Sequence, residues 1–271
     1  MRTQQTSHWQ ELWQSQMTDM AARSNTDYWN RRAVDYNDFI TTSRFDYGEQ
    51  MASILVKEGV AHPPASVLEI ASGVGAVTLP LASRARHLTA LEPAGTMARL
   101  LQENIRANGA DNVRIVVEDF ATHAAKAEDD TFDLVLLCHA AWQFPDIVWL
   151  VREMSRLARS FCCLADTMGT GDAEDQDLQH RLSLRTPTLD RSLYIFNVLH
   201  ELGCPANLAP VRHVMRRSSA SARAMWTNLV SKYREVSPED ERIIDDHVAS
   251  RCMDGIYQSP GTMALMWWRV S

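Results

Sequence analysis

The middle of the chain alternates between short, almost wholly apolar runs and longer segments whose apolar residues recur at helical spacing. The short runs predict buried strands and the longer segments predict helices, because the two structures place apolar side chains at different intervals. The predicted strands are 67–70, 87–91, 113–117, 132–137 and 161–165, and the predicted helices are 76–85, a segment ending at 108, and 147–159. This alternation is typical of an α/β fold in which helices cover both faces of a doubly wound parallel sheet.

The segment before this region is rich in aromatic residues and contains few aliphatic ones. Its apolar positions predict a helix around 9–20, a second over 27–40 with Asp27 as its N-cap, and a third over 47–58 that ends before Gly59. We therefore expect residues 1–60 to form an N-terminal helical extension. It is either a lid over a cleft or an additional packing layer.

The pattern changes again after the last predicted parallel strand. Residues 170–205 predict a helical insertion, and two further strands, 211–216 and 263–270, are separated by helices around 219–235 and 238–255. If these strands pair, they add an antiparallel edge to the sheet. Trp267 and Trp268 alternate along the second strand, so we expect at most one to face the core and the other to meet a partner in a homodimer. Residues 61–271 are therefore expected to form one domain.

The charge balance narrows the class of partner. The chain carries 27 Lys and Arg against 34 Asp and Glu, a formal net charge of −7, which argues against nucleic acid because phosphate binding depends on clustered basic residues. The sequence has neither the long apolar run of a membrane span nor the apolar core of a signal peptide at its start. The five cysteines are few and indicate reduced thiols. We expect a cytoplasmic enzyme without a membrane partner.

A glycine-containing segment follows the first predicted strand. Small residues from Ala71 to Gly75 let the backbone approach a ligand closely, and the start of the next helix offers free N–H groups to an anion. Glu92 ends the second strand, where a carboxylate can accept both hydroxyls of a ribose. Asp119 follows the third strand and could accept a hydrogen bond from an adenine amino group, with Phe120 covering the ring.

The loop does not have the pattern of a dinucleotide site. The G-x-G-x-x-G fingerprint would need glycines where Ala71 and Thr78 stand. Glu69, four residues before Gly73, has no role in binding a pyrophosphate. A nicotinamide cofactor is therefore disfavoured, and a different nucleoside-containing cofactor is indicated.

These motifs resemble those of the class I S-adenosylmethionine-dependent methyltransferases over about residues 60–168. The matching segments are Glu69-x-Ala-x-Gly73-x-Gly75, Glu92-Pro93, Glu118-Asp119-Phe120 and Phe132-Asp133. The resemblance implies a seven-stranded sheet of order 3-2-1-4-5-7-6 with strand 7 antiparallel. It also implies S-adenosylmethionine as cofactor and S-adenosylhomocysteine as product. The departure from the family pattern is Ala71, which stands where the first glycine is usual.

The resemblance assigns roles to individual residues. It places Glu92 at the ribose, and it places against the methionine moiety the loop residues Glu69, Ala71, Gly73 and Gly75. Pro93 and Met97 would lie beside the adenine. Asp119 would lie at the edge of the adenine ring and Phe120 on its face. Cys138 and His139 would border the transferred methyl group. The segment from Tyr28 to Tyr36 resembles the lid of many members that act on small molecules, which brings Tyr36 to the cofactor.

The residues after the fourth strand bear on the methyl acceptor. The sequence Cys-His-Ala-Ala at 138–141 lacks both the Asp/Asn-Pro-Pro-Tyr/Phe signature of amide and base-nitrogen methylation and the Pro-Cys pair of cytosine C5 methylation. These absences favour in-line methyl transfer to a small molecule. The alternatives are methylation of RNA or protein, and a regulatory or partner subunit that binds cofactor without turnover. No histidine and cysteine set has convincing ligand spacing, so we expect no metal site.

Several residues are candidates for the acceptor side of the site. His139 is the candidate general base because the ordinary pKa of histidine, about 6.5, allows proton uptake at neutral pH; a pocket-lining role and a structural role are the alternatives. Trp142, Tyr28 and Tyr194 are candidate walls of the acceptor pocket, with core packing as the alternative. A basic stretch either attracts an anionic acceptor or forms a solvated face beside an edge strand, and we expect the solvated face; it comprises Arg212, His213, Arg216, Arg217 and Arg223.

Overall fold

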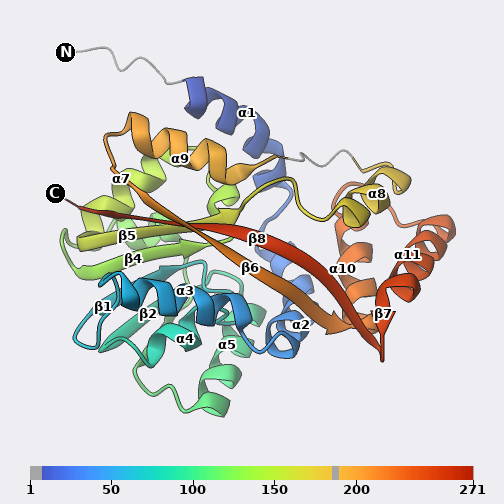
Figure 1. Ribbon diagram of the computed structural model, residues 1–271, viewed down its shortest axis with the longest axis horizontal. Coiled ribbons are helices and arrows are strands. Elements are labelled where there is room, and N and C mark those ends of the chain that lie inside the picture. The colour runs from blue at the N-terminus through green and yellow to red at the C-terminus, as the bar shows by residue number, and fades with distance from the viewer. Residues whose placement is uncertain (1–7, 185–188, 271) are drawn as a thin grey trace.

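A mixed β-sheet runs through the centre of the protein (Figure 1), whose computed structural model describes residues 8–184 and 189–270. Its strands lie in the order β3-β2-β1-β4-β5-β8-β6, with the short β7 paired to β8. They are β1 (Ser66–Ile70), β2 (His87–Leu91), β3 (Val113–Val116), β4 (Phe132–Cys138), β5 (Ala158–Thr167), β6 (Asn207–Ser218), β7 (Cys252–Met253) and β8 (Ile256–Arg269). The first five strands are parallel, and β8 is antiparallel to both β5 and β6. The predicted order, with the last long strand inserted antiparallel, is confirmed.

Helices cover both faces of this sheet, as the sequence pattern predicts (Figure 1). One face packs against α3 (Asp46–Lys57), α4 (Thr78–Ala82) and α5 (Gly95–Asn108), and the other against α1 (His8–Ala22), α6 (Phe120–Ala124), α7 (Ile147–Leu157) and α9 (Arg191–Glu201). A one-turn 3₁₀ helix, η1 (Ala141–Gln143), follows β4. The strands between the two layers are nearly wholly apolar because both of their faces are buried.

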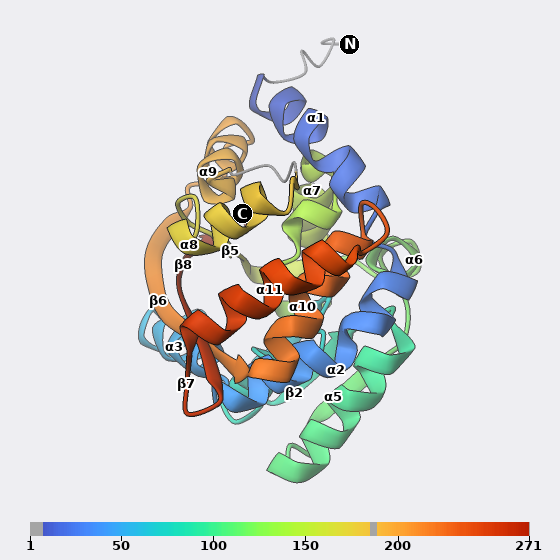
Figure 2. The ribbon, with the colours of Figure 1, turned by 90° about the vertical axis from the view of Figure 1, so that its right-hand side faces the viewer.

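A second group of helices surrounds the far ends of β6 and β8. These strands pair over twelve residues, from Asn207–Trp267 to Ser218–Ile256. Their ends contact α8 (Ala173–Arg181), α10 (Ser219–Ser231) and α11 (Pro238–Arg251), which share a small apolar core of their own. Helix α2 (Thr26–Thr42) packs against β6, α5 and α10, so it joins this group to the central sheet (Figure 2). None of the described helices is both long enough and apolar enough to cross a membrane.

Three predictions about single elements are wrong. Helix α4 spans five residues rather than ten, and the late strands are longer than predicted because they continue past the sheet to the second helical group. Helix α2 is capped by Asn25, whose side chain accepts a hydrogen bond from Tyr28 N, and not by Asp27, which lies inside the first turn.

Both tryptophans of β8 are buried, which also differs from the prediction. Trp267 is 6% exposed and Trp268 is 1% exposed. They point to opposite faces of the strand, but each face is covered by a helical layer, so that each ring enters a different core cluster. Neither ring therefore supports the predicted homodimer contact, and the homodimer stays a prediction.

Candidate functional site

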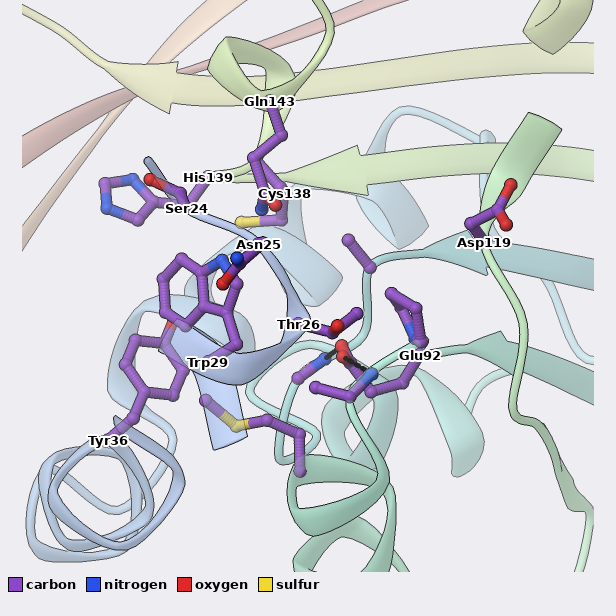
Figure 3. A pocket seen from close by; sticks show the side chains of 16 residues that line it. Ser24, Asn25, Thr26, Trp29, Tyr36, Glu92, Asp119, Cys138, His139 and Gln143 are labelled. Carbon is purple, nitrogen blue, oxygen red and sulfur yellow. Dashed lines mark hydrogen bonds between the residues drawn. The ribbon is translucent and has the colours of Figure 1, made fainter. Parts of the chain in front are cut away.

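A cavity opens at the carboxyl ends of β1, β2 and β4, where sheets of this type bind ligands. It holds about 820 Å³ of empty space, its mouth included. Asp119 and Glu92 lie at one end, and Trp29, Tyr36 and His139 lie at the other (Figure 3). Eight of the eleven residues predicted to bind cofactor line this cavity: Tyr36, Ala71, Gly73, Glu92, Pro93, Met97, Asp119 and Cys138.

The loop after β1 brings backbone close to this cavity. Ala71, Gly73 and Gly75 have φ angles of 54°, 57° and 98°, in the left-handed region that favours glycine. Ala71 therefore adopts the conformation for which the family usually employs glycine. Gly75 is behind the loop rather than on the cavity wall, and a Cβ atom there would lie 2.7 Å from Leu101 Cδ1. Gly75 thus allows the loop to pack on α5 and does not itself face a ligand.

Glu92 joins the end of β2 to the glycine loop. Its Oε2 accepts a hydrogen bond from Gly73 N at 2.8 Å, and its Oε1 accepts one from Ala94 N at 2.9 Å. Burial raises the pKa of the carboxyl group to about 7, although these two N–H groups act in the opposite direction. Each oxygen keeps a second lone pair, so the group can accept further hydrogen bonds from a ligand in the cavity.

Glu69 does not line the cavity. It is 2% exposed, and its Oε2 accepts a hydrogen bond from Thr78 Oγ1 at the start of α4. Burial raises the pKa of this carboxyl group to about 8. Glu69 therefore supports the loop from behind, and its predicted contact with a methionine moiety stays a prediction. Helix α4 is also too short to offer the anion site that the sequence suggests.

The side chains of Asp119 and Phe120, at the start of α6, have different surroundings. Asp119 lines the cavity and caps the helix, its two oxygens accepting hydrogen bonds from Thr122 N and Thr122 Oγ1, each at 2.8 Å. Phe120 points away from the cavity into the core, with ring centroids 5.6 Å from Trp149 and 6.2 Å from Phe144. The expectation that Phe120 covers an adenine ring is therefore wrong, because the first turn of α6 aims this side chain at α7.

Aromatic residues of α2 close the other end of the cavity. The rings of Trp29 and Tyr36 meet edge to face at 6.0 Å, and Tyr36 also lies over Gly73. Cys138, at the end of β4, donates a weak hydrogen bond to Met51 Sδ at 3.7 Å. The indole N–H of Trp29 is buried and has no hydrogen-bond partner among the described residues. Side chains of α2 thus line this end of the cavity, and the role of the segment as a lid stays a prediction.

His139 borders the same end of the cavity in a strained backbone conformation. Its φ angle is 57°, its N–H donates to Ala165 O, and its carbonyl accepts from Trp142 Nε1 at 3.0 Å. Nδ1 is buried, has no hydrogen-bond partner among the described residues, and lies 3.9 Å from Oδ1 of the buried Asp166. Enclosure by the cavity lowers the pKa of His139 to about 4, against the opposing effect of Asp166. The ring is therefore neutral at neutral pH.

The three residues predicted to wall an acceptor pocket do not line this cavity. Trp142 is 8% exposed and packs beside Trp29, and the buried Tyr28 accepts a hydrogen bond from Arg32 Nη1. Tyr194 lies on α9, where its ring meets Trp9 of α1 at 5.5 Å. These rings belong to the core and to helix contacts, which is the alternative that the sequence left open.

Other lining residues were not identified from the sequence. They come from the turn before α2 and from the loops after β2 and β4, and they include Ser24, Asn25, Thr26, Ala94 and Ala140. Asp166 was also missed, although it lies one residue before the end of the apolar strand β5, at the edge of the sheet where ligands bind. Its Oδ1 accepts a hydrogen bond from Arg191 Nε at 2.7 Å, and its Oδ2 is buried without a partner in the described part of the chain.

Comparison with known proteins agrees with this architecture. Residues 67–160 match the family model described as "Methyltransferase domain". No curated protein matches the chain in sequence. Among solved structures, a candidate methyltransferase from Bacillus halodurans C-125 is 18% identical over 80% of this chain and 97% of its own, with a TM-score of 0.54.

Two further structures have the same fold. A candidate sarcosine dimethylglycine methyltransferase from Galdieria sulphuraria is 19% identical over 83% of this chain and 85% of its own, with a TM-score of 0.53. A candidate S-adenosyl-L-methionine-dependent methyltransferase from Methanococcus maripaludis is 22% identical over 65% of this chain and 86% of its own, with a TM-score of 0.50. The match over residues 67–160 and the fold shared with these structures agree with the resemblance of the sequence motifs to class I S-adenosylmethionine-dependent methyltransferases.

Proposed function

We propose that the protein transfers a methyl group from S-adenosylmethionine to a small-molecule acceptor. The observation that carries this proposal is the placement of Glu92. It is anchored to the glycine loop and faces the same cavity as the α2 lid. One end of the cavity thus has the acceptor for ribose hydroxyls, and the other has an aromatic lid over the end of β4.

The residues of the cavity suit this cofactor. Glu92 keeps free lone pairs beside the glycine loop, and Pro93 and Met97 offer apolar surface next to it. At the other end, the buried N–H of Trp29 lacks a partner among the described residues, which a bound ligand would supply. Aromatic faces at this end also favour a sulfonium charge. These features support the cofactor assignment from the residues alone.

The protein's contribution to the reaction is mainly binding and orientation. When bound, S-adenosylmethionine supplies a methyl group that is already activated by its attachment to a positive sulfur. The chain must hold a nucleophile about 3 Å from that group, in line with the bond that breaks. Trp29 and Tyr36 cover this end of the cavity and exclude water, and Cys138 and His139 border it. A proton lost by the acceptor would pass to His139 or to solvent.

The lid also supports a small acceptor. Residues Ser24 to Thr26 and the two lid rings cover the cavity, so an acceptor must fit beneath α2. The net charge of −7 gives little attraction for RNA. The following experiment separates two alternatives. One is methylation of RNA or protein, and the other is cofactor binding without turnover.

The test uses methyl-labelled S-adenosylmethionine with a cell extract separated into small-molecule, RNA and protein fractions. We expect label to accumulate in the small-molecule fraction with the wild-type protein and not with Glu92→Ala. The variant Glu103→Ala, at an exposed position of α5, is the matched control and should behave as wild type. Label in RNA or protein alone would show that the acceptor class is wrong. Binding of S-adenosylhomocysteine without any labelled product would instead indicate a binding subunit.

A further inference from the structure

A second cavity lies among the second group of helices. It holds about 600 Å³ of empty space, its mouth and the adjoining solvent included. Its walls come from α2, α8, α10 and the far ends of β6 and β8. Apolar surface is provided by Trp226 and Met225 of α10, and two arginines, Arg32 and Arg217, are part of the lining.

Arg217 is the unusual residue of this cavity. It is only 3% exposed, yet no described residue accepts a hydrogen bond from its guanidinium group, and its Nη1 is buried without a partner. Its described contacts are the ring of Phe39, 4.8 Å from Cζ, and Asp35 Oδ2 at 3.8 Å from Nη1, which is beyond hydrogen-bond distance. A buried cation with unused donors is costly unless something else binds it.

The neighbouring charges do not compensate Arg217. Asp35 accepts two hydrogen bonds from Arg32 Nε, at 2.8 and 3.1 Å, so its charge is matched by Arg32. Two arginines thus face one carboxylate that hydrogen-bonds only to Arg32, so Arg217 has no hydrogen-bonded counter-ion. Asp38 also acts on Arg217, but more weakly, and its carboxylate accepts a hydrogen bond from Ser218 N.

A carboxylate on the opposite wall limits what the cavity can accept. Asp175 accepts hydrogen bonds from Arg251 Nη1, Tyr257 Oη and Ser259 Oγ at 3.1, 2.6 and 2.7 Å. It is therefore engaged elsewhere and is not the counter-ion of Arg217. A ligand with two negative charges would be repelled by Asp175, whereas one with a single charge would supply the hydrogen-bonded counter-ion that Arg217 lacks. A carboxylate also fits the planar, forked donor set of a guanidinium group.

The cavity lies beside the proposed site of methyl transfer. Arg32 is three residues after Trp29 and four before Tyr36, so the three side chains project from one face of α2, with neighbouring Cβ atoms about 5–6 Å apart. The ring of Phe39 is 5.7 Å from that of Tyr36 and also contacts Arg217. The contacts from Arg217 through the ring of Phe39 therefore lead to Tyr36, which lines the cofactor cavity.

We expected the basic stretch of the sequence to form a solvated face, but its residues differ in exposure. Arg212 is exposed, but Arg217 is turned into the protein because β6 continues between α2 and α10. Burial and the charge of Arg32 lower the pKa of Arg217 to about 10, which still leaves it protonated at neutral pH.

We propose that this cavity binds the carboxylate group of a monoanionic methyl acceptor, and that Arg217 is the residue that holds it. The identification of this ligand as the methyl acceptor rests on the proposed function, whereas the binding of a carboxylate at Arg217 can be tested separately. The acceptor class is then a small organic acid whose reacting atom lies a short chain away from its carboxylate.

The experiment measures the melting temperature, with and without saturating S-adenosylhomocysteine, in the presence of butyrate, benzoate, their neutral amides, or inorganic phosphate. We expect at least one acid to raise the melting temperature of the wild-type protein by about 2–4 °C when present at several times its Kd. The matching amide should have less than half of this effect. Arg217→Met should abolish the rise, and Arg212→Met, at an exposed position of the same strand, should keep it.

The unliganded variants separate binding from structure. If Arg217 is a ligand-binding residue, Arg217→Met should melt no earlier than the wild type, because an apolar side chain replaces an uncompensated buried cation. Arg217→Lys keeps the positive charge but lacks the forked donor set of the guanidinium group, so the acid should raise its melting temperature by less. Early melting of both variants, equal responses to acids and amides, or a response to phosphate alone would overturn the proposal. A failure of S-adenosylhomocysteine to stabilise any variant would count against the proposed function instead.

Discussion

Three carboxylates around the glycine loop differ in what they can still bind. Glu69 is enclosed and bonded to Thr78, and Asp119 uses both oxygens to cap α6. Glu92 faces the cavity and accepts one backbone N–H at each oxygen. Its remaining lone pairs make it the residue on which cofactor affinity should depend most.

Removal of the Glu92 carboxylate should weaken binding without unfolding the protein. We expect Glu92→Ala to reduce the affinity for S-adenosylhomocysteine by about 1–3 kcal/mol, the loss typical of charge-assisted hydrogen bonds. Isothermal titration calorimetry measures this change directly. Glu103→Ala, on the exposed side of α5, should leave the affinity as it is. An equal affinity in Glu92→Ala would mean that the ribose site lies elsewhere.

The raised pKa of Glu92 predicts a pH dependence of binding. The carboxyl group is mostly protonated below its pKa of about 7 and mostly charged above it. The charged form is the stronger acceptor for ribose hydroxyls, so affinity should increase by up to about tenfold as the pH rises from 6 to 8. In Glu92→Gln the increase should disappear, whereas Glu69→Gln should retain it. An affinity that falls with rising pH in the wild type would contradict this account.

His139 is a weak base in this environment, which bears on its predicted catalytic role. With a pKa of about 4, the ring binds a proton poorly at neutral pH. Once an acceptor is known, we expect His139→Gln to reduce turnover by less than about tenfold and to keep the pH profile of the wild type, because general-base catalysis would contribute 10²–10⁴-fold. A hundredfold loss with a changed pH profile would establish His139 as the general base.

The sequence predicted which residues meet at the site better than it predicted the direction of their side chains. Glu92 and Tyr36 face the cavity as expected, since strand ends and a helix face fix where they lie. Phe120 does not, because the turn of a short helix decides which way it points. Arg217 was expected in solvent, and only the continuation of β6 beyond the sheet buries it.

At the scale of elements, α3 lies in close contact with the backbone that follows the glycine loop. A Cβ atom on Gly48 of α3 would lie 1.9 Å from the carbonyl oxygen of Ala76 and 3.2 Å from Pro80 Cγ. The backbone of the loop therefore rests directly on the helix. This contact explains how α3, far from the cavity in sequence, helps to fix the loop that carries Gly73.

We expect Gly48→Ala to lower the free energy of unfolding by about 1–3 kcal/mol, because the backbone must shift to accommodate the methyl group. The higher helix propensity of alanine offsets only part of this loss. The matched control is Gly95→Ala on α5, where nothing lies within 4 Å of the added atom and stability should be unchanged or slightly higher. Urea unfolding measures both. A neutral Gly48→Ala would show that the loop adapts freely to α3.

Element boundaries were predictable where side chains carry the signal. Gly109 ends α5 in a left-handed conformation, as its position after Asn108 indicates. The start of α2 was misjudged because Asn25 and Asp27 are both good capping residues, and only the tertiary position of the helix selects Asn25. This choice brings the turn before α2 to the cavity.

The whole molecule consists of a predicted sheet and two additions with different roles. The N-terminal extension lines the cofactor cavity through α2 and packs α1 on α7 and α9. Of the described insertion residues, none lines the cofactor cavity, although Arg191 supports Asp166 and Asp175 lines the second cavity. The extended β6 and β8 could not be predicted, because their outer halves are fixed by contacts with distant helices.

The most direct test of the central claim is calorimetric titration of the wild-type protein with S-adenosylhomocysteine, NAD and NADP. We expect micromolar binding of S-adenosylhomocysteine, with a corresponding rise in melting temperature, and no binding of either dinucleotide. Binding of NAD or NADP in place of S-adenosylhomocysteine, or no binding of S-adenosylhomocysteine, would contradict it.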